Sequence, residues 1–197
     1  MPDSIVCENV VRVENLSRRF GEMMALDGVS LQIKPGLAYG LVGANGAGKT
    51  TFIKHLLGLL KAKQGSVQVF GRDPVECPVE VLSRIGYLSE ERDLPHWMRI
   101  DQLLKYTCAH YPGWDRRYAE ELLQTFGLDV SKKVKQLSKG MRAQVGLVAA
   151  VAHHPDLLLL DEPSTGLDAV VLFSYIRKVL GDRCGVDLGA GTADQPI

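Results

Sequence analysis

A glycine-rich run in the first part of the chain has the residue types and spacing of a phosphate-binding loop. The pattern G-x-x-x-x-G-K-[ST] is matched in full by Gly43-Ala44-Asn45-Gly46-Ala47-Gly48-Lys49-Thr50. Glycines let backbone N–H groups curl around phosphate oxygens, and the N-terminus of a following helix adds a positive dipole end. Lys49 would place its charge on the β- and γ-phosphates, and Thr50 would offer its hydroxyl to Mg²⁺. The alternative is a glycine-rich turn that carries a chance lysine.

A pair of carboxylates follows an apolar run later in the chain. Four consecutive leucines at 157–160 are followed directly by Asp161 and Glu162. In open α/β sheets, ligands bind at the carboxyl ends of the strands. Asp161 would therefore hold Mg²⁺ through water, and Glu162 would polarise the attacking water as a general base. The alternative is a strand that ends in a solvated acidic turn.

A third segment, 137–141, begins an apolar helix. Its sequence is Leu-Ser-Lys-Gly-Met, and Ser138 suits the N-cap position. The Ser138 hydroxyl and the Gly140 amide could also face a phosphate at this helix N-terminus. From spacing alone, a plain helix cap and a phosphate contact are equally good interpretations.

The elements that must position these residues alternate between strands and helices. Periodicity predicts strands at 10–13, 30–33, 37–42, 66–70, 85–88 and 157–160, and helices at 48–60, 100–110, 115–126, 140–153 and 169–180. Such alternation predicts an α/β fold with parallel strands. The strand at 30–33 alternates apolar and polar residues and suits antiparallel pairing. The stretch from about 90 to 153 is interpreted as a helical insertion.

Composition favours a globular protein and gives no support to a general nucleic-acid binder. The 197 residues are 46% hydrophobic and 23% charged, and 23 basic residues balance 23 acidic ones. The four cysteines lie far apart, which favours reduced thiols in a cytosolic protein over a disulfide framework. No stretch approaches the ~18 consecutive apolar residues of a membrane span, and no secretory leader is evident. We therefore expect a cytoplasmic location.

In their order along the chain, these motifs resemble the nucleotide-binding domain of ABC (ATP-binding cassette) proteins. The phosphate loop matches Walker A, residues 137–141 match an LSGGQ-like signature, and 157–161 match Walker B with Glu162 after it. A D-loop follows at 164–168, Ser-Thr-Gly-Leu-Asp. Many ATPases and kinases share a lone phosphate loop, whereas the signature ahead of Walker B is far more specific. The resemblance, over about residues 10–179, implies a single domain with a P-loop NTPase-type core, a mainly parallel sheet, N-terminal antiparallel strands and a helical subdomain at about 90–153.

The resemblance also implies ATP and Mg²⁺ as ligands, and hydrolysis of ATP to ADP and phosphate. Lys49 and Glu162 would be catalytic, and Thr50, Glu90 and Asp161 would hold the metal. It implies that Phe20 stacks on adenine, with core packing as the alternative. In a head-to-tail dimer, Ser138 of one subunit would meet the γ-phosphate held by Lys49 of the other. The implied nucleotide-binding residues are Phe20, Gly43, Asn45, Gly46, Ala47, Gly48, Lys49, Thr50, Thr51, Ser138 and Gly140.

The sequence departs from the family pattern at three places. Lys139 and Met141 stand where the signature usually has glycine and glutamine. Glu90 stands at the Q-loop glutamine position, where it could meet Mg²⁺ or its water or be a solvated loop acid. No histidine follows Asp168, although the family has a switch histidine there. Our hypothesis is that the C-terminal part is truncated or altered, with a disordered tail at 181–197, which would impair hydrolysis more than binding.

We therefore expect the ATPase subunit of an ABC transporter, acting on a separate membrane permease from the inner face of the cell membrane. The LSKGM signature favours export weakly. Pro95, Trp97, Met98 and Ile100 would form the docking surface, or else belong to the core of the helical subdomain. The alternative function is a hydrolysis-deficient nucleotide-binding module. A soluble ABC protein of translation or DNA repair fits poorly, because the chain has one phosphate loop and no sustained heptads.

Overall fold

The computed structural model describes residues 9–44, 46–89 and 94–161. Its contacts divide the chain into two compact units. Among the described residues, the first unit runs to Leu82 and the second begins at Ser83. Each unit buries its own set of apolar side chains.

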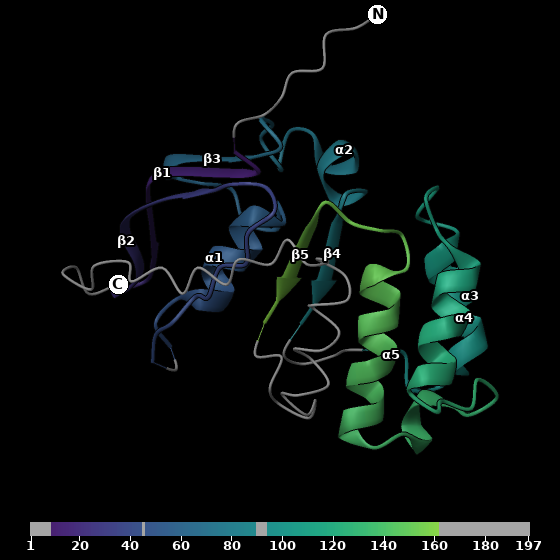
Figure 1. Cartoon of the computed structure of the whole chain (residues 1–197). Helices are drawn as coiled ribbons and strands as arrows, with labels where there is room; N and C mark the ends of the chain where they lie inside the picture. Colours follow the sequence, from purple (N-terminus) through teal and green to yellow (C-terminus); the bar gives the residue numbers. More distant parts are fainter. Residues whose placement is uncertain (1–8, 45, 90–93, 162–197) are drawn as a thin grey trace, which may run out of the picture. The chain divides into compact units, whose positions relative to one another are not determined.

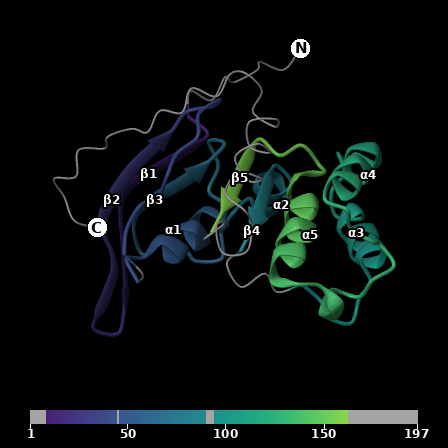
Figure 2. The same cartoon turned by 60° about the horizontal axis from the view of Figure 1, so that its bottom comes forward.

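The first unit contains an antiparallel sheet with a helix packed against it. β1 (Val11–Phe20) lies between β2 (Met23–Ile33) and β3 (Gln64–Val69), and both pairings are antiparallel. α1 (Lys49–Leu56) packs against this sheet, and α2 (Pro78–Leu82) follows β3 in the chain (Figures 1 and 2). Burying one face of an antiparallel sheet under a helix leaves its other face to solvent. The buried apolar residues here are Val11, Val13, Leu16, Leu26, Phe52, Ile53, Leu56, Leu57, Val67, Val69, Phe70 and Val81.

β1 and β2 form a long hairpin, which Figure 2 shows. Its pairing is irregular toward the turn. Phe20 pairs with Met23, so the turn holds two residues. The register shifts on both sides of Arg18, which pairs with Leu26 while Arg19 pairs with Met24. Ala25 is therefore an extra residue on β2, a bulge that bends the strand and redirects its backbone groups.

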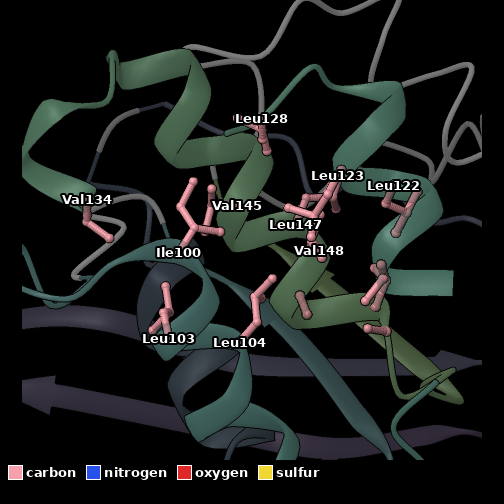
Figure 3. Close-up of a cluster of buried hydrophobic side chains, with 14 of the residues drawn as sticks. Ile100, Leu103, Leu104, Leu122, Leu123, Leu128, Val134, Val145, Leu147 and Val148 are labelled. Atoms are coloured by element: carbon pink, nitrogen blue, oxygen red, sulfur yellow. The ribbon is translucent and has the colours of Figure 1, made fainter. Parts of the chain in front are cut away.

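The second unit combines a parallel strand pair with three helices. β4 (Ile85–Leu88) and β5 (Leu157–Leu160) pair in parallel along their whole length. The helices are α3 (Ile100–Cys108), α4 (Arg116–Thr125) and α5 (Lys139–Val151), and a 3₁₀ turn at Val134–Gln136 precedes α5. Their apolar faces meet in one core, part of which Figure 3 shows. The labelled residues of that core are Ile100, Leu103, Leu104, Leu122, Leu123, Leu128, Val134, Val145, Leu147 and Val148.

The structure confirms an α/β fold with antiparallel N-terminal strands, a parallel strand pair and a helical segment. The helix predicted at 48–60 ends earlier, at Leu56, because Gly58 takes a left-handed φ of +67°. The predicted strand at 37–42 is wrong: no described strand pairs with it, and Val42 is 86% exposed. An apolar run becomes a strand only where a ladder partner is available. The helix at 169–180 and the tail at 181–197 lie outside the described residues.

One histidine of the second unit is buried at the junction of α5 and β4. His153 is 7% exposed, and its ring stacks on Tyr111 with 3.9 Å between the centroids. Its Nε2 lies 3.2 Å from the Ile85 carbonyl oxygen, while its Nδ1 is buried without a partner among the described residues. Burial lowers the pKa of His153, and the charge of His154 lowers it further. A second proton on the ring would have no acceptor.

We expect the free energy of unfolding to decrease as the pH is lowered, because of His153. The folded pKa of His153 lies below its ordinary value of 6.5, so the unfolded chain takes up the proton first. The free energy of unfolding should be constant above that value and should decline as pH drops below it. Urea unfolding at pH 7.5 and pH 5.5 measures the change. His153→Phe, which keeps a ring on Tyr111, should make the decline shallower and leave the part due to buried His55, whereas exposed His96→Gln should not change it. A wild-type profile that stays level would contradict this assignment.

Candidate functional site

The glycine-rich loop ahead of α1 exposes backbone N–H groups at the N-terminus of the helix. Gly46 and Gly48 take left-handed φ angles of +86° and +85°. The Ala47 N–H donates to the Ala44 carbonyl at 3.1 Å, which tightens the turn. Gly48 is the N-cap of α1 and supplies no side-chain cap, whereas the first N–H groups of a helix have no acceptor within it. The loop is therefore a backbone nest of the kind that binds anions.

Lys49 lies across this nest. Its Nζ donates to the carbonyl oxygens of Gly43 at 2.7 Å and Ala44 at 3.2 Å. Thr50 and Thr51 follow in the first turn of α1, and both are half-buried. A cation, a helix N-terminus and two hydroxyl-bearing residues thus lie within one short segment, and this combination suits a phosphate with its counter-ion.

The nest packs against the hairpin. A Cβ added at Gly48 would overlap the carbonyl oxygen of Ala25, the bulge residue of β2, and would touch Leu26. Gly48 is therefore needed twice, for its left-handed φ and for this close approach. A small apolar hollow lies behind the loop, lined by Leu26, Val29, Leu41, Val42, Ala47, Gly48, Lys49 and Phe52.

The hairpin also carries an exposed aromatic ring at its end. Phe20 is the last residue of β1 and is 43% exposed, so the core-packing alternative for it is wrong. The guanidinium carbon of Arg18 lies 4.8 Å from the Phe20 ring centroid. This distance is that of a cation–π contact on one face of the ring.

The second unit holds three further candidates. Ser138 is the N-cap of α5 and accepts a hydrogen bond from the Met141 N–H at 3.2 Å, so its capping role is confirmed. Gly140 lies in the first turn of the same helix. Asp161 follows β5, is 3% exposed, and donates its N–H to the Leu88 carbonyl at 2.9 Å, which extends the parallel ladder. The carboxylate thus stands at the carboxyl end of the strand pair, as predicted.

Several predicted site residues lie outside the described residues: Asn45, Glu90, Glu162 and the D-loop at 164–168. Within the part of the chain that the structure describes, no group of three or more His, Cys, Asp or Glu side chains could hold a metal ion. The donors that remain, the Thr50 hydroxyl and the Asp161 carboxylate, are the hard oxygen ligands that Mg²⁺ takes together with water and phosphate oxygens. Each of these donors by itself suits the predicted ion, and magnesium binding stays a prediction.

The proposed docking residues divide between core and surface. Ile100 is fully buried and Met98 packs against the helical core, so the core alternative is confirmed for these two. Trp97 is 69% exposed and lies just before α3. No helix in the described stretches is long and apolar enough to cross a bilayer.

Two features of the site were missed by sequence analysis. Arg18 was not considered, because the predicted strand ended at residue 13 and left no register to place it beside Phe20. The contact of Ala25 with Gly48 depends on a bulge, and bulges leave no periodic signal. An arginine two positions before an aromatic residue on a strand is a usable signal only once the strand is extended to Phe20.

Comparison with known protein families gives one match that covers most of the chain. Residues 26–165 match the family model described as ABC transporter. An uncharacterised ABC transporter ATP-binding protein of Bacillus subtilis, YhaQ, is 41% identical over 82% of this chain and 55% of its own length. The daunorubicin resistance ATP-binding protein DrrA3 of Streptomyces coeruleorubidus is 38% identical over 89% of this chain and 58% of its own length.

Other relatives and solved structures agree. The bacitracin transport ATP-binding protein BcrA of Bacillus licheniformis is 32% identical over 86% of this chain and 56% of its own length. A solved structure of an ATP binding subunit of an ABC transporter aligns with a TM-score of 0.76 at 27% identity, over 87% of this chain and 75% of that one. The chain thus spans about half the length of these curated relatives.

Proposed function

This chain belongs to the ABC transporter family, and on that premise we propose that it binds and hydrolyses ATP to drive a separate membrane permease. The observation that carries the proposal is the glycine nest at the N-terminus of α1, with Lys49 across it. Relatives named for bacitracin transport and daunorubicin resistance favour export, because resistance is met most simply by moving a compound outward. The same names do not favour the hydrolysis-deficient alternative.

In this proposal the phosphate loop does most of the binding. The backbone N–H groups of residues 46–50 hold the β- and γ-phosphates, and Lys49 exchanges its contacts with Gly43 and Ala44 for phosphate oxygens. Phe20 stacks on the adenine from the end of the hairpin. Catalysis then comes mainly from positioning and charge stabilisation, with Glu162 orienting the attacking water.

Thr50 and Asp161 would hold Mg²⁺, with Glu90 near its water shell. A bound magnesium ion would neutralise charge on the phosphate oxygens. Asp161 is buried directly after β5, and a nearby cation stabilises a buried carboxylate. Its proposed role therefore agrees with its burial.

We further propose a head-to-tail dimer in which Ser138 contacts the γ-phosphate of the other subunit. Ser138→Ala removes both the cap and the proposed contact, and losing the cap alone should cost about 1 kcal/mol of stability. Ser138→Asn keeps a good cap and replaces the small hydroxyl with a bulkier carboxamide, which displaces the donor from its place near the γ-phosphate. We expect Ser138→Asn to melt like wild type and to hydrolyse ATP about tenfold more slowly or worse. Hydrolysis at the wild-type rate by Ser138→Asn would leave Ser138 with its capping role alone.

The permease would contact the surface around Trp97, on the cytoplasmic face of the membrane. A tryptophan that is 69% exposed is a typical anchor of a protein interface. Pro95 is half-buried beside it and could support the same contact.

The direct test is calorimetric titration of the whole 197-residue chain with ATP, with and without magnesium. We expect saturable binding that magnesium strengthens, together with release of phosphate. A chain that folds but takes up no ATP under either condition would overturn the proposal.

A further inference from the structure

Arg18 lies between the aromatic end of the hairpin and the phosphate-loop helix. It is two residues before Phe20 on β1, with a register shift on each side of it. Residues two apart on a strand share a face, so the guanidinium can reach the ring. The observed distance from the guanidinium carbon to the ring centroid, 4.8 Å, confirms that it does.

A hydrogen bond links the same side chain to the segment that follows α1, and its charge acts on a histidine of α1. The Nη1 of Arg18 donates to the Lys61 carbonyl at 3.4 Å, and Lys61 comes soon after α1. Burial lowers the pKa of His55 on α1, and the nearby charge of Arg18 adds to this effect. The Nε of Arg18 is buried and has no acceptor among the described residues. The side chain is therefore half-enclosed rather than a freely solvated surface arginine.

We propose that Arg18 is a positioning residue that holds the Phe20 ring for stacking on the nucleotide base. The inference rests on the proposed ATP-binding function and names a residue that the phosphate-loop motif does not contain. The guanidinium covers one face of the ring, and Phe20 as a residue remains 43% exposed. Its link to the segment after α1 sets the ring at a defined place relative to the helix that holds the phosphates.

Physical chemistry gives this arrangement two consequences. A ring that is already held on one side loses less conformational entropy when a base stacks on its other side. The entropic cost of binding is therefore smaller. The cation also draws π-density toward itself, which suits the opposite face to an electron-rich purine. Both effects act on the base and leave the phosphates untouched, so they can be separated by experiment.

The test compares Arg18→Met with Arg19→Met. Arg19 is adjacent, exposed and of the same charge, which makes it a matched control. Binding of Mg·ATP and of Mg·tripolyphosphate, which has no base, is measured by calorimetry. We expect Arg18→Met to weaken ATP binding about three- to tenfold, with tripolyphosphate binding and melting temperature close to wild type. Arg19→Met should change neither. Equal loss of both ligands in Arg18→Met, or equal behaviour of the two variants, would overturn the proposal.

Two more variants make the test specific to the ring. Arg18→Lys keeps a cation and should restore most of the ATP affinity. In a Phe20→Ala background, Arg18→Met should have no further effect, because the two residues act as a pair. If Arg18→Met does not fold, Arg18→Gln is subjected to the same comparison. Failure of the proposed function is distinct, since then the folded wild-type chain itself would bind neither Mg·ATP nor Mg·tripolyphosphate.

Discussion

A Lys49→Ala variant is expected to lose ATP hydrolysis by a factor of about 100 to 1000 and to bind Mg·ATP much more weakly. Removing one preorganised charge from a phosphate-transfer site typically costs this much in rate. The fold should be almost unaffected, because the hydrogen bonds that Lys49 donates to the Gly43 and Ala44 carbonyls are exposed and contribute little net stability.

The control for this prediction is Lys54→Ala on the same helix. Lys54 is exposed in the last turn of α1, so its removal changes the net charge equally but leaves the nest intact. Calorimetric titration with Mg·ATP, a phosphate-release assay and thermal melting compare the two variants with wild type. If Lys49→Ala and Lys54→Ala behave alike, Lys49 does not act on the nucleotide.

The phosphate loop was predictable because its determinants are local. The spacing of Gly43, Gly48 and Lys49 defines the turn, and the apolar stripe of α1 fixes the helix that must follow. The same holds for Ser138, whose cap depends on residues within one turn. The position of Asp161 was predictable as well, since a run of four leucines is typical of a buried strand and Asp161 follows it directly.

Features that depend on partners distant in sequence were not predictable in this way. The apolar run at 37–42 looks like a strand by composition, yet no described strand supplies its hydrogen bonds. The contact of Ala25 with Gly48 depends on a register shift in the hairpin, whereas that of Arg18 with Phe20 is local and requires only that the strand continue to Phe20. Register follows from the whole pairing of β1 with β2, and one extra residue changes which groups face the loop.

A Gly48→Ala variant tests whether that contact matters to the site. Alanine at a φ of +85° costs about 1–2 kcal/mol, and its Cβ would overlap the backbone carbonyl of Ala25, at a further cost of about 1–3 kcal/mol. We therefore expect a loss of about 2–5 kcal/mol in the free energy of unfolding, measured with urea. Mg·ATP binding should be lost as well, because the loop must move away from β2.

Gly46→Ala provides the matched control, because Gly46 has nearly the same φ, +86°, with nothing within 4 Å of the added Cβ. It should cost only the conformational term of about 1–2 kcal/mol. The difference between the two variants isolates the packing of the loop against the hairpin from the strain that both share. Equal losses would mean that the nest is held by its own glycines alone. A larger loss of stability at Gly48, together with loss of Mg·ATP binding in that variant alone, would mean that packing against the Ala25 bulge shapes the nest, and that the hairpin which carries Phe20 helps to hold it.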